Sequence, residues 1–166
     1  MEKYFNNFEF KVKKLDESSI FEVFGICENN KKYYENYLHE NANIEETKTI
    51  FTDLPPNTTF SQKFVLGFYN NQKLLAFCDL ILNYPNTQSA MIGLLMVDQN
   101  FQGQGIGKNI VKKILEVLKL KSIKFCEIGV IDNNIEGLAF WQKMGFDSYS
   151  QKTQDKLTFI KMRKKL

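Results

Sequence analysis

The sequence predicts an α/β protein in which a mixed β-sheet carries helices on both faces. Short apolar runs of strand length alternate along the chain with longer runs of helical periodicity. Their order is one strand, two or three helices, three strands, and then helix, strand, helix and two strands, which is the order of a layered α/β fold. No repeat, linker or low-complexity tract interrupts the 166 residues, so we expect a single domain over residues 1–166.

The first third of the chain predicts one strand followed by helices. Residues 8–15 alternate apolar and polar side chains, which is a strand pattern. Asp16 is a suitable cap for a helix that runs to about residue 28 and whose inner face includes Phe21. Residues 31–40 are typical of a polar, aromatic helix, and residues 44–53 of a short third helix that ends before two prolines.

The middle of the chain predicts a hairpin and then a buried strand. Residues 64–69 and 74–82 are strand-like and are joined by Asn70-Asn71-Gln72, which is a hairpin signal. Residues 91–97 are apolar except for Gly93, as in a central strand that is covered on both faces. This strand is the predicted centre of the sheet.

The last third predicts two helices and three strands. Apolar side chains repeat at helical spacing from Ile106 onward. Asn133 and Glu136 resemble the capping box of a second helix, which would end at Gly145. The strands are expected at residues 124–130, 146–150 and 157–162.

Composition excludes several classes of function. The net charge is only +3 and Arg163 is the only arginine, so we expect no nucleic-acid partner. The three cysteines are widely spaced and predict small core residues in a reducing compartment. A single histidine, His39, without a ligand cluster predicts no metal site. The chain has no apolar run of membrane-spanning length and no signal-peptide core near residue 1, so we expect a cytoplasmic protein without a membrane partner.

The most informative segment is the run Gln102-Gly103-Gln104-Gly105-Ile106-Gly107-Lys108, between a predicted strand and a predicted helix. Three glycines in five residues let successive N–H groups converge on one anion, and the helix N-terminus adds positive potential. The segment fails the ATP/GTP loop pattern, because Gln102 and Asn109 replace its first glycine and its last hydroxyl. It also fails the dinucleotide pattern, which requires glycine where Lys108 stands.

The same segment resembles the signature of the GNAT superfamily of acyl-CoA-dependent N-acetyltransferases, [R/Q]-x-x-G-x-[G/A] after an apolar strand. A second block matches as well, with its residues at the family's spacings: Asn134, Gly137, Phe140-Trp141 and Gly145-Phe146. The resemblance covers nearly the whole order of elements. It implies a mixed, mostly antiparallel sheet in which the central pair of strands is splayed, with Gly93 and Gly129 admitting a ligand between them.

The resemblance also implies a site for acetyl-CoA or coenzyme A. The amides of the glycine loop would bind its pyrophosphate, and the strand before the loop would pair with its pantetheine arm. Asn134 would contact pantetheine, although Asn133 suits a helix start equally well. The implied coenzyme-binding residues are Leu95, Met96, Val97, Gln102, Gly103, Gln104, Gly105, Ile106, Gly107, Lys108, Asn134, Phe140 and Trp141.

Acyl transfer to an amine requires a base and a donor for the developing oxyanion. The resemblance implies that the Val97 N–H is the oxyanion contact. Trp141 stands where many relatives carry a tyrosine acid, and an indole is not an acid near neutral pH, so Trp141 is equally a core or pocket-wall residue. No carboxylate interrupts residues 91–97, but Asp79 and Glu127 interrupt the two neighbouring strands and are the candidate bases. Each is equally explained by a solvent-facing position.

The resulting hypothesis is an N-acetyltransferase that moves an acetyl group from acetyl-CoA to a primary amine. The alternative is a non-catalytic acyl-CoA-binding sensor or regulatory module, which the missing tyrosine favours. The acceptor pocket is expected from residues 33–63 and the turn at Tyr84. The expected partners are acetyl-CoA and the amine, and the resemblance is compatible with a homodimer.

Overall fold

A computed structural model describes residues 1–154 and 156–166. These residues form a seven-stranded sheet in the spatial order β1-β2-β3-β4-β5-β7-β6. The strands are β1 (Lys11–Lys14), β2 (Lys63–Asn70), β3 (Lys73–Leu82), β4 (Ser89–Val97), β5 (Phe125–Ile131), β6 (Asp147–Gln154) and β7 (Leu157–Lys165).

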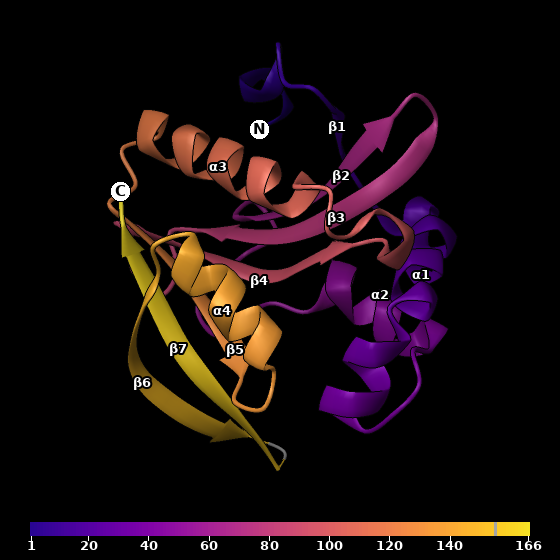
Figure 1. The fold of residues 1–166 in the computed structure, drawn as a ribbon. Helices are drawn as coiled ribbons and strands as arrows, with labels where there is room; N and C mark the ends of the chain where they lie inside the picture. Colours follow the sequence, from indigo (N-terminus) through magenta and orange to yellow (C-terminus); the bar gives the residue numbers. More distant parts are fainter. Residues whose placement is uncertain (155) are drawn as a thin grey trace.

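The helices occupy the segments between these strands. The α-helices are α1 (Ile20–Asn29), α2 (Ile44–Thr52), α3 (Ile106–Leu120) and α4 (Ile135–Lys143). Four short segments are η1 (Glu2–Phe5), η2 (Glu17–Ser19), η3 (Tyr33–Leu38) and η4 (Gln99–Phe101), of which η3 is a π-helix and the others are 3-10 helices. Figure 1 shows α3 and α4 together, well apart from α1 and α2.

The two central strands part in the middle of the sheet. All described pairings are antiparallel except that of β4 with β5, which is parallel and extends only from Ser89 with Phe125 to Ile92 with Ile128. Beyond these pairs the strands diverge (Figure 1). The α/β class, the mostly antiparallel sheet and the splayed central pair are therefore confirmed.

Two glycines mark the point where the strands part. Gly93 and Gly129 are the residues that immediately follow the last β4–β5 pair. Gly93 is also the extra residue of a bulge, because Asp79 pairs with Leu94 while Leu80 pairs with Ile92. The bulge bends β4 away from β5, which opens the edge of β4 on that side.

The sheet has a separate hydrophobic core on each face. One core joins the sheet to α3 and α4 through residues such as Ile110, Ile114 and Trp141. The other joins it to α1 and α2 through residues such as Val23 and Phe51. Because side chains alternate along a strand, consecutive residues of a strand pack into different cores.

Several local predictions differ from the structure. Phe21 is 77% exposed, because α1 turns Val23, Ile26 and Cys27 toward the sheet instead. The cap of α4 is Asn134, which accepts from the Gly137 N–H at 2.9 Å, so the capping box on Asn133 was wrong. None of the helices in residues 1–154 and 156–166 combines the length and apolar character needed to cross a bilayer.

Candidate active site

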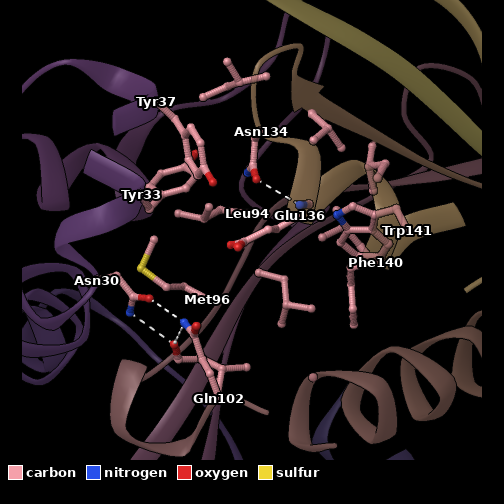
Figure 2. A pocket seen from close by; sticks show the side chains of 18 of the residues that line it. Asn30, Tyr33, Tyr37, Leu94, Met96, Gln102, Asn134, Glu136, Phe140 and Trp141 are labelled. Carbon is pink, nitrogen blue, oxygen red and sulfur yellow. Dashed lines mark hydrogen bonds between the residues drawn. The ribbon is translucent and has the colours of Figure 1, made fainter. Parts of the chain in front are cut away.

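A cavity of about 730 Å³ lies where β4 and β5 part. It is bounded by β4 and β5, the glycine loop, the start of α3, α4, and the segment from Asn30 to Tyr37. In Figure 2, Phe140 and Trp141 lie on one side, Tyr33 and Tyr37 lie on the opposite side, and Leu94 lies between them. The cavity is therefore formed by segments that are far apart in sequence.

The glycine loop forms one end of the cavity. Gly103 and Gly105 have φ angles of +75° and +83°, in the left-handed region that favours glycine. Gly105 is the N-cap of α3, and a Cβ at either glycine would have no neighbour within 4 Å. The loop thus leaves its backbone open at a helix N-terminus, which is a favourable position for an anion.

A partly buried amide network holds this loop against β4. The Gln102 side chain donates to Asn30 Oδ1 at 2.6 Å and to the Val97 carbonyl at 3.0 Å. Asn30 also donates to the Val97 carbonyl, at 3.1 Å, and is only 4% exposed. Asn30 was not predicted as a site residue, because the sequence alone presents it only as the residue after a helix.

The same network indicates how Val97 is oriented. Its carbonyl accepts from side chains on the cavity side, while the next N–H, that of Asp98, donates to Leu75 of β3 at 2.8 Å. In a strand, the N–H and C=O of one residue point to the same edge. The Val97 N–H therefore faces the open edge of β4, as an oxyanion contact requires.

The α4 wall is aromatic. Phe140 and Trp141 pack edge to face with ring centroids 5.1 Å apart, and Trp141 packs on Phe146 at 5.0 Å. Trp141 lines the cavity but is only 9% exposed, so it belongs both to the core and to the pocket wall. Asn134 also lines the cavity, and its capping bond uses Oδ1 and leaves Nδ2 available.

The opposite wall contains two tyrosines. Tyr33 and Tyr37 pack edge to face at 6.2 Å, and burial raises the pKa of Tyr33 to about 12. Lys32 donates to Glu136 of α4 at 2.6 Å, which links the two walls. Both of these charged side chains are at least half exposed, so the ion pair contributes little to stability.

The cavity brings together twelve of the thirteen residues that were expected to bind coenzyme A. Gln104 is the exception, because its side chain points back toward the Asn100 carbonyl. Tyr84, which was expected at the acceptor pocket, is not among the lining residues. The residues that the sequence placed on two separate motifs therefore line one cavity.

Asp79 lies directly behind the cavity wall. Lys63 donates to both of its carboxylate oxygens at 2.9 Å, and the Asp79 side chain is 14% exposed while that of Lys63 is 4% exposed. Burial raises the pKa of Asp79, although the hydrogen bond and charge of Lys63 oppose that shift. Asp79 is thus a buried, paired carboxylate and does not face open solvent.

Glu127 has more hydrogen-bond partners than Asp79. It accepts from Tyr149 at 2.6 Å and from Arg163 at 2.8 Å and 3.1 Å, and it is 6% exposed. Arg163 also stacks over the rings of Phe125 and Tyr149. Glu127 does not line the cavity, so its neighbours indicate a structural role for this candidate.

Comparison with known proteins identifies the class. The family model described as the acetyltransferase (GNAT) family matches residues 25–146. The chain therefore belongs to the GNAT acetyltransferase family, and the resemblance seen in its sequence is confirmed.

Individual relatives agree with this assignment. An uncharacterised N-acetyltransferase of Methanocaldococcus jannaschii is 30% identical over 70 residues, which is 42% of this chain. This chain spans about a third of that relative, since the match covers 31% of it.

Solved structures share the fold at low sequence identity. An acetyltransferase of Thermus thermophilus has a TM-score of 0.76 at 16% identity, over 95% of this chain and 97% of the other. The PaiA N-acetyltransferase of Thermoplasma acidophilum, solved with coenzyme A, has a TM-score of 0.69 at 20% identity, over 95% and 99% of the two chains. These likenesses support the same fold.

Proposed function

We propose that this protein is an N-acetyltransferase that transfers an acetyl group from acetyl-CoA to a primary amine. The observation that carries the proposal is the single cavity that runs from the glycine loop, along the open edge of β4, to the wall that holds Tyr33. A phosphate-bearing thioester would enter from the loop end. The amine would enter from the tyrosine side.

The chain's own groups suit an extended coenzyme. The N–H groups of residues 102–108 supply donors at the N-terminus of α3, where Gly103 and Gly105 keep the approach open. Beyond Ile92, β4 lacks its β5 partner, so the backbone of Leu95 and Val97 can pair with an amide-containing arm as a further strand would. The PaiA relative was solved with coenzyme A, which supports the same ligand here.

The reaction joins the acceptor nitrogen to the acyl carbon and breaks the carbon–sulfur bond. Acetyl-CoA supplies the activated acyl thioester. The Val97 N–H donates to the carbonyl oxygen as negative charge develops on it. Asp79 removes the proton of the acceptor ammonium, whose pKa near 10.4 otherwise keeps it protonated. The departing thiolate receives, through water, the second proton of the acceptor nitrogen, since Trp141 is not an acid that could supply one.

Thiol release measures this function. Acetyl-CoA is offered with a panel of primary amines, including polyamines, amino acids and peptides, and free thiol is followed with time. We expect amine-dependent release that saturates in both substrates. Tight binding of acetyl-CoA without release of thiol for any amine would contradict catalysis and favour the acyl-CoA sensor. The specific argument for the sensor is the absence of a tyrosine at position 141.

Trp141 is expected to shape the site without transferring a proton. Trp141→Phe keeps an aromatic ring packed against Phe146 and removes the indole N–H. We predict less than about a tenfold loss of turnover, below the usual contribution of a general acid. Steady-state kcat at saturating substrates tests this, with circular dichroism as the folding control. A thousandfold loss in a folded variant would mean that the indole takes part in the chemistry.

A further inference from the structure

The Asp79 carboxylate occupies space that a side chain on the central strand would otherwise fill. A Cβ built on Gly93 of β4 would lie 2.9 Å from Asp79 Oδ2. That distance is shorter than real contacts of this kind, so a side chain at position 93 would force the Asp79 carboxylate or β4 to shift. Asp79 itself belongs to β3, where it pairs with Leu94 across the bulge.

Gly93 lies between this carboxylate and the cavity. Gly93 is exposed and lines the cavity, whereas Asp79 is mostly buried and does not line it. Without a side chain at position 93, a single water can bridge Oδ2 and a group inside the cavity, which is within the reach of a general base. A larger residue there would close this approach.

Lys63 fixes the carboxylate from the other side. It lies on β2 and donates to both oxygens at 2.9 Å, and at 4% exposed it has almost no freedom to swing away. Lys63 shares a face of β2 with Val65, which belongs to the core under α1 and α2. A buried cation with a bidentate partner is a fixed part of the structure and not a mobile surface charge.

We propose that Lys63 and Gly93 are the positioning residues of the acetyl-transfer site: Lys63 holds the Asp79 carboxylate in place, and Gly93 opens it to the acceptor amine. This proposal rests on the proposed function. The acceptor ammonium gives one proton, through a water, to Asp79. The free amine then forms the carbon–nitrogen bond as the carbon–sulfur bond of the thioester breaks. The excess proton on the bonded nitrogen passes through water to the thiolate, and Asp79 returns its own proton to solvent.

The groups around Asp79 determine the expected pH dependence. Lys63 from β2 favours the ionised form, Asp53 after α2 disfavours it, and β4 contributes only the non-titratable Gly93 and Leu94. Burial is the largest influence and raises the pKa of Asp79. Removing Lys63 therefore raises that pKa further, and the carboxylate acts as a base only at higher pH.

The first test is the pH profile of kcat/KM for the amine in Lys63→Met and Lys63→Arg. In Lys63→Met we expect the acidic limb to move up by about one pH unit or more, with a loss at neutral pH that higher pH partly restores. Lys63→Arg keeps a cation and should keep the limb near its wild-type position. Folded Lys63→Met with an unmoved limb, or both variants with the same shift, would overturn the proposal.

The second test does not depend on whether Lys63→Met folds. Gly93→Ala should displace the carboxylate and lower turnover at least about tenfold, and it should add little to Asp79→Asn because both changes act on the same group. Gly129→Ala is the matched control for the pH profile, since its Cβ meets only Phe159 at 3.8 Å and the acidic limb should not move. Fully additive losses for Gly93→Ala and Asp79→Asn would overturn the proposal.

These experiments separate two failures. If the wild-type protein releases no thiol from acetyl-CoA with any amine, the proposed function fails. If the wild type is active but Gly93→Ala and both Lys63 variants keep its rate and its pH profile, the function stands and the positioning role is contradicted.

Discussion

Gly105→Glu is expected to weaken coenzyme A binding by about a hundredfold or more while the protein stays folded. The loop end of the cavity receives a pyrophosphate in the proposed function, and a carboxylate there repels it. Two unit charges 4 Å apart repel by about 4 kcal/mol at an effective dielectric constant of 20. Because 1.4 kcal/mol corresponds to a tenfold change in affinity, a repulsion of this size corresponds to a loss of more than about a hundredfold.

Calorimetric titration with coenzyme A measures this effect, and Gly105→Ala is the matched control. Both variants place a side chain at a φ of +83°, which costs roughly 1–2 kcal/mol in local strain. Neither Cβ meets another atom, since nothing lies within 4 Å. Alanine therefore reports the strain alone, and we expect less than about a tenfold loss. Unchanged affinity in folded Gly105→Glu would exclude the loop as the pyrophosphate site.

Asp79→Asn is expected to lower turnover by about a hundredfold or more at neutral pH. The amide has nearly the shape of the carboxylate and can still accept from Lys63, but it cannot take a proton from the acceptor. As pH rises toward the pKa of the acceptor, near 10.4, free amine becomes abundant without a base. Part of the lost activity should therefore return at high pH.

Glu127→Gln is the matched comparison for Asp79→Asn. Glu127 is bound to Tyr149 and Arg163 and lies away from the cavity, so its substitution should affect stability more than turnover. Rate profiles for both variants between pH 6 and 10, together with thermal unfolding curves, distinguish the two carboxylates. Wild-type profiles for both variants would show that the acceptor loses its proton elsewhere.

The two motifs could be predicted from sequence because their chemistry is local. A positive φ at Gly103 and Gly105 and a helix that begins at Ile106 depend on residues within a few positions of one another. The spacing from Asn134 to Trp141 is likewise fixed by one helix, α4. These segments therefore indicated the end of the cavity that is proposed to bind coenzyme A, and both lie within residues 25–146, which the family model matches.

Capping and helix orientation were less predictable because alternatives of similar energy compete. Asn133 and Asn134 suit a helix start equally well, and only the folded turn selects Asn134. Phe21 fits the apolar pattern of α1, yet the sheet receives the neighbouring face of the helix. Packing decides such cases, because it buries one face of a helix and leaves the others in water.

The sequence by itself determined the family, the layered α/β fold and the glycine loop that is proposed to bind phosphate, since each depends on residues close together in the chain. Only the tertiary structure decided the surroundings of Asp79. Its partner Lys63 lies on another strand, β2. The Asp79 carboxylate lies beside Gly93, which is the extra residue of the bulge between β3 and β4. Strand register brings these three residues together, and register is set by packing and by turns over the whole sheet.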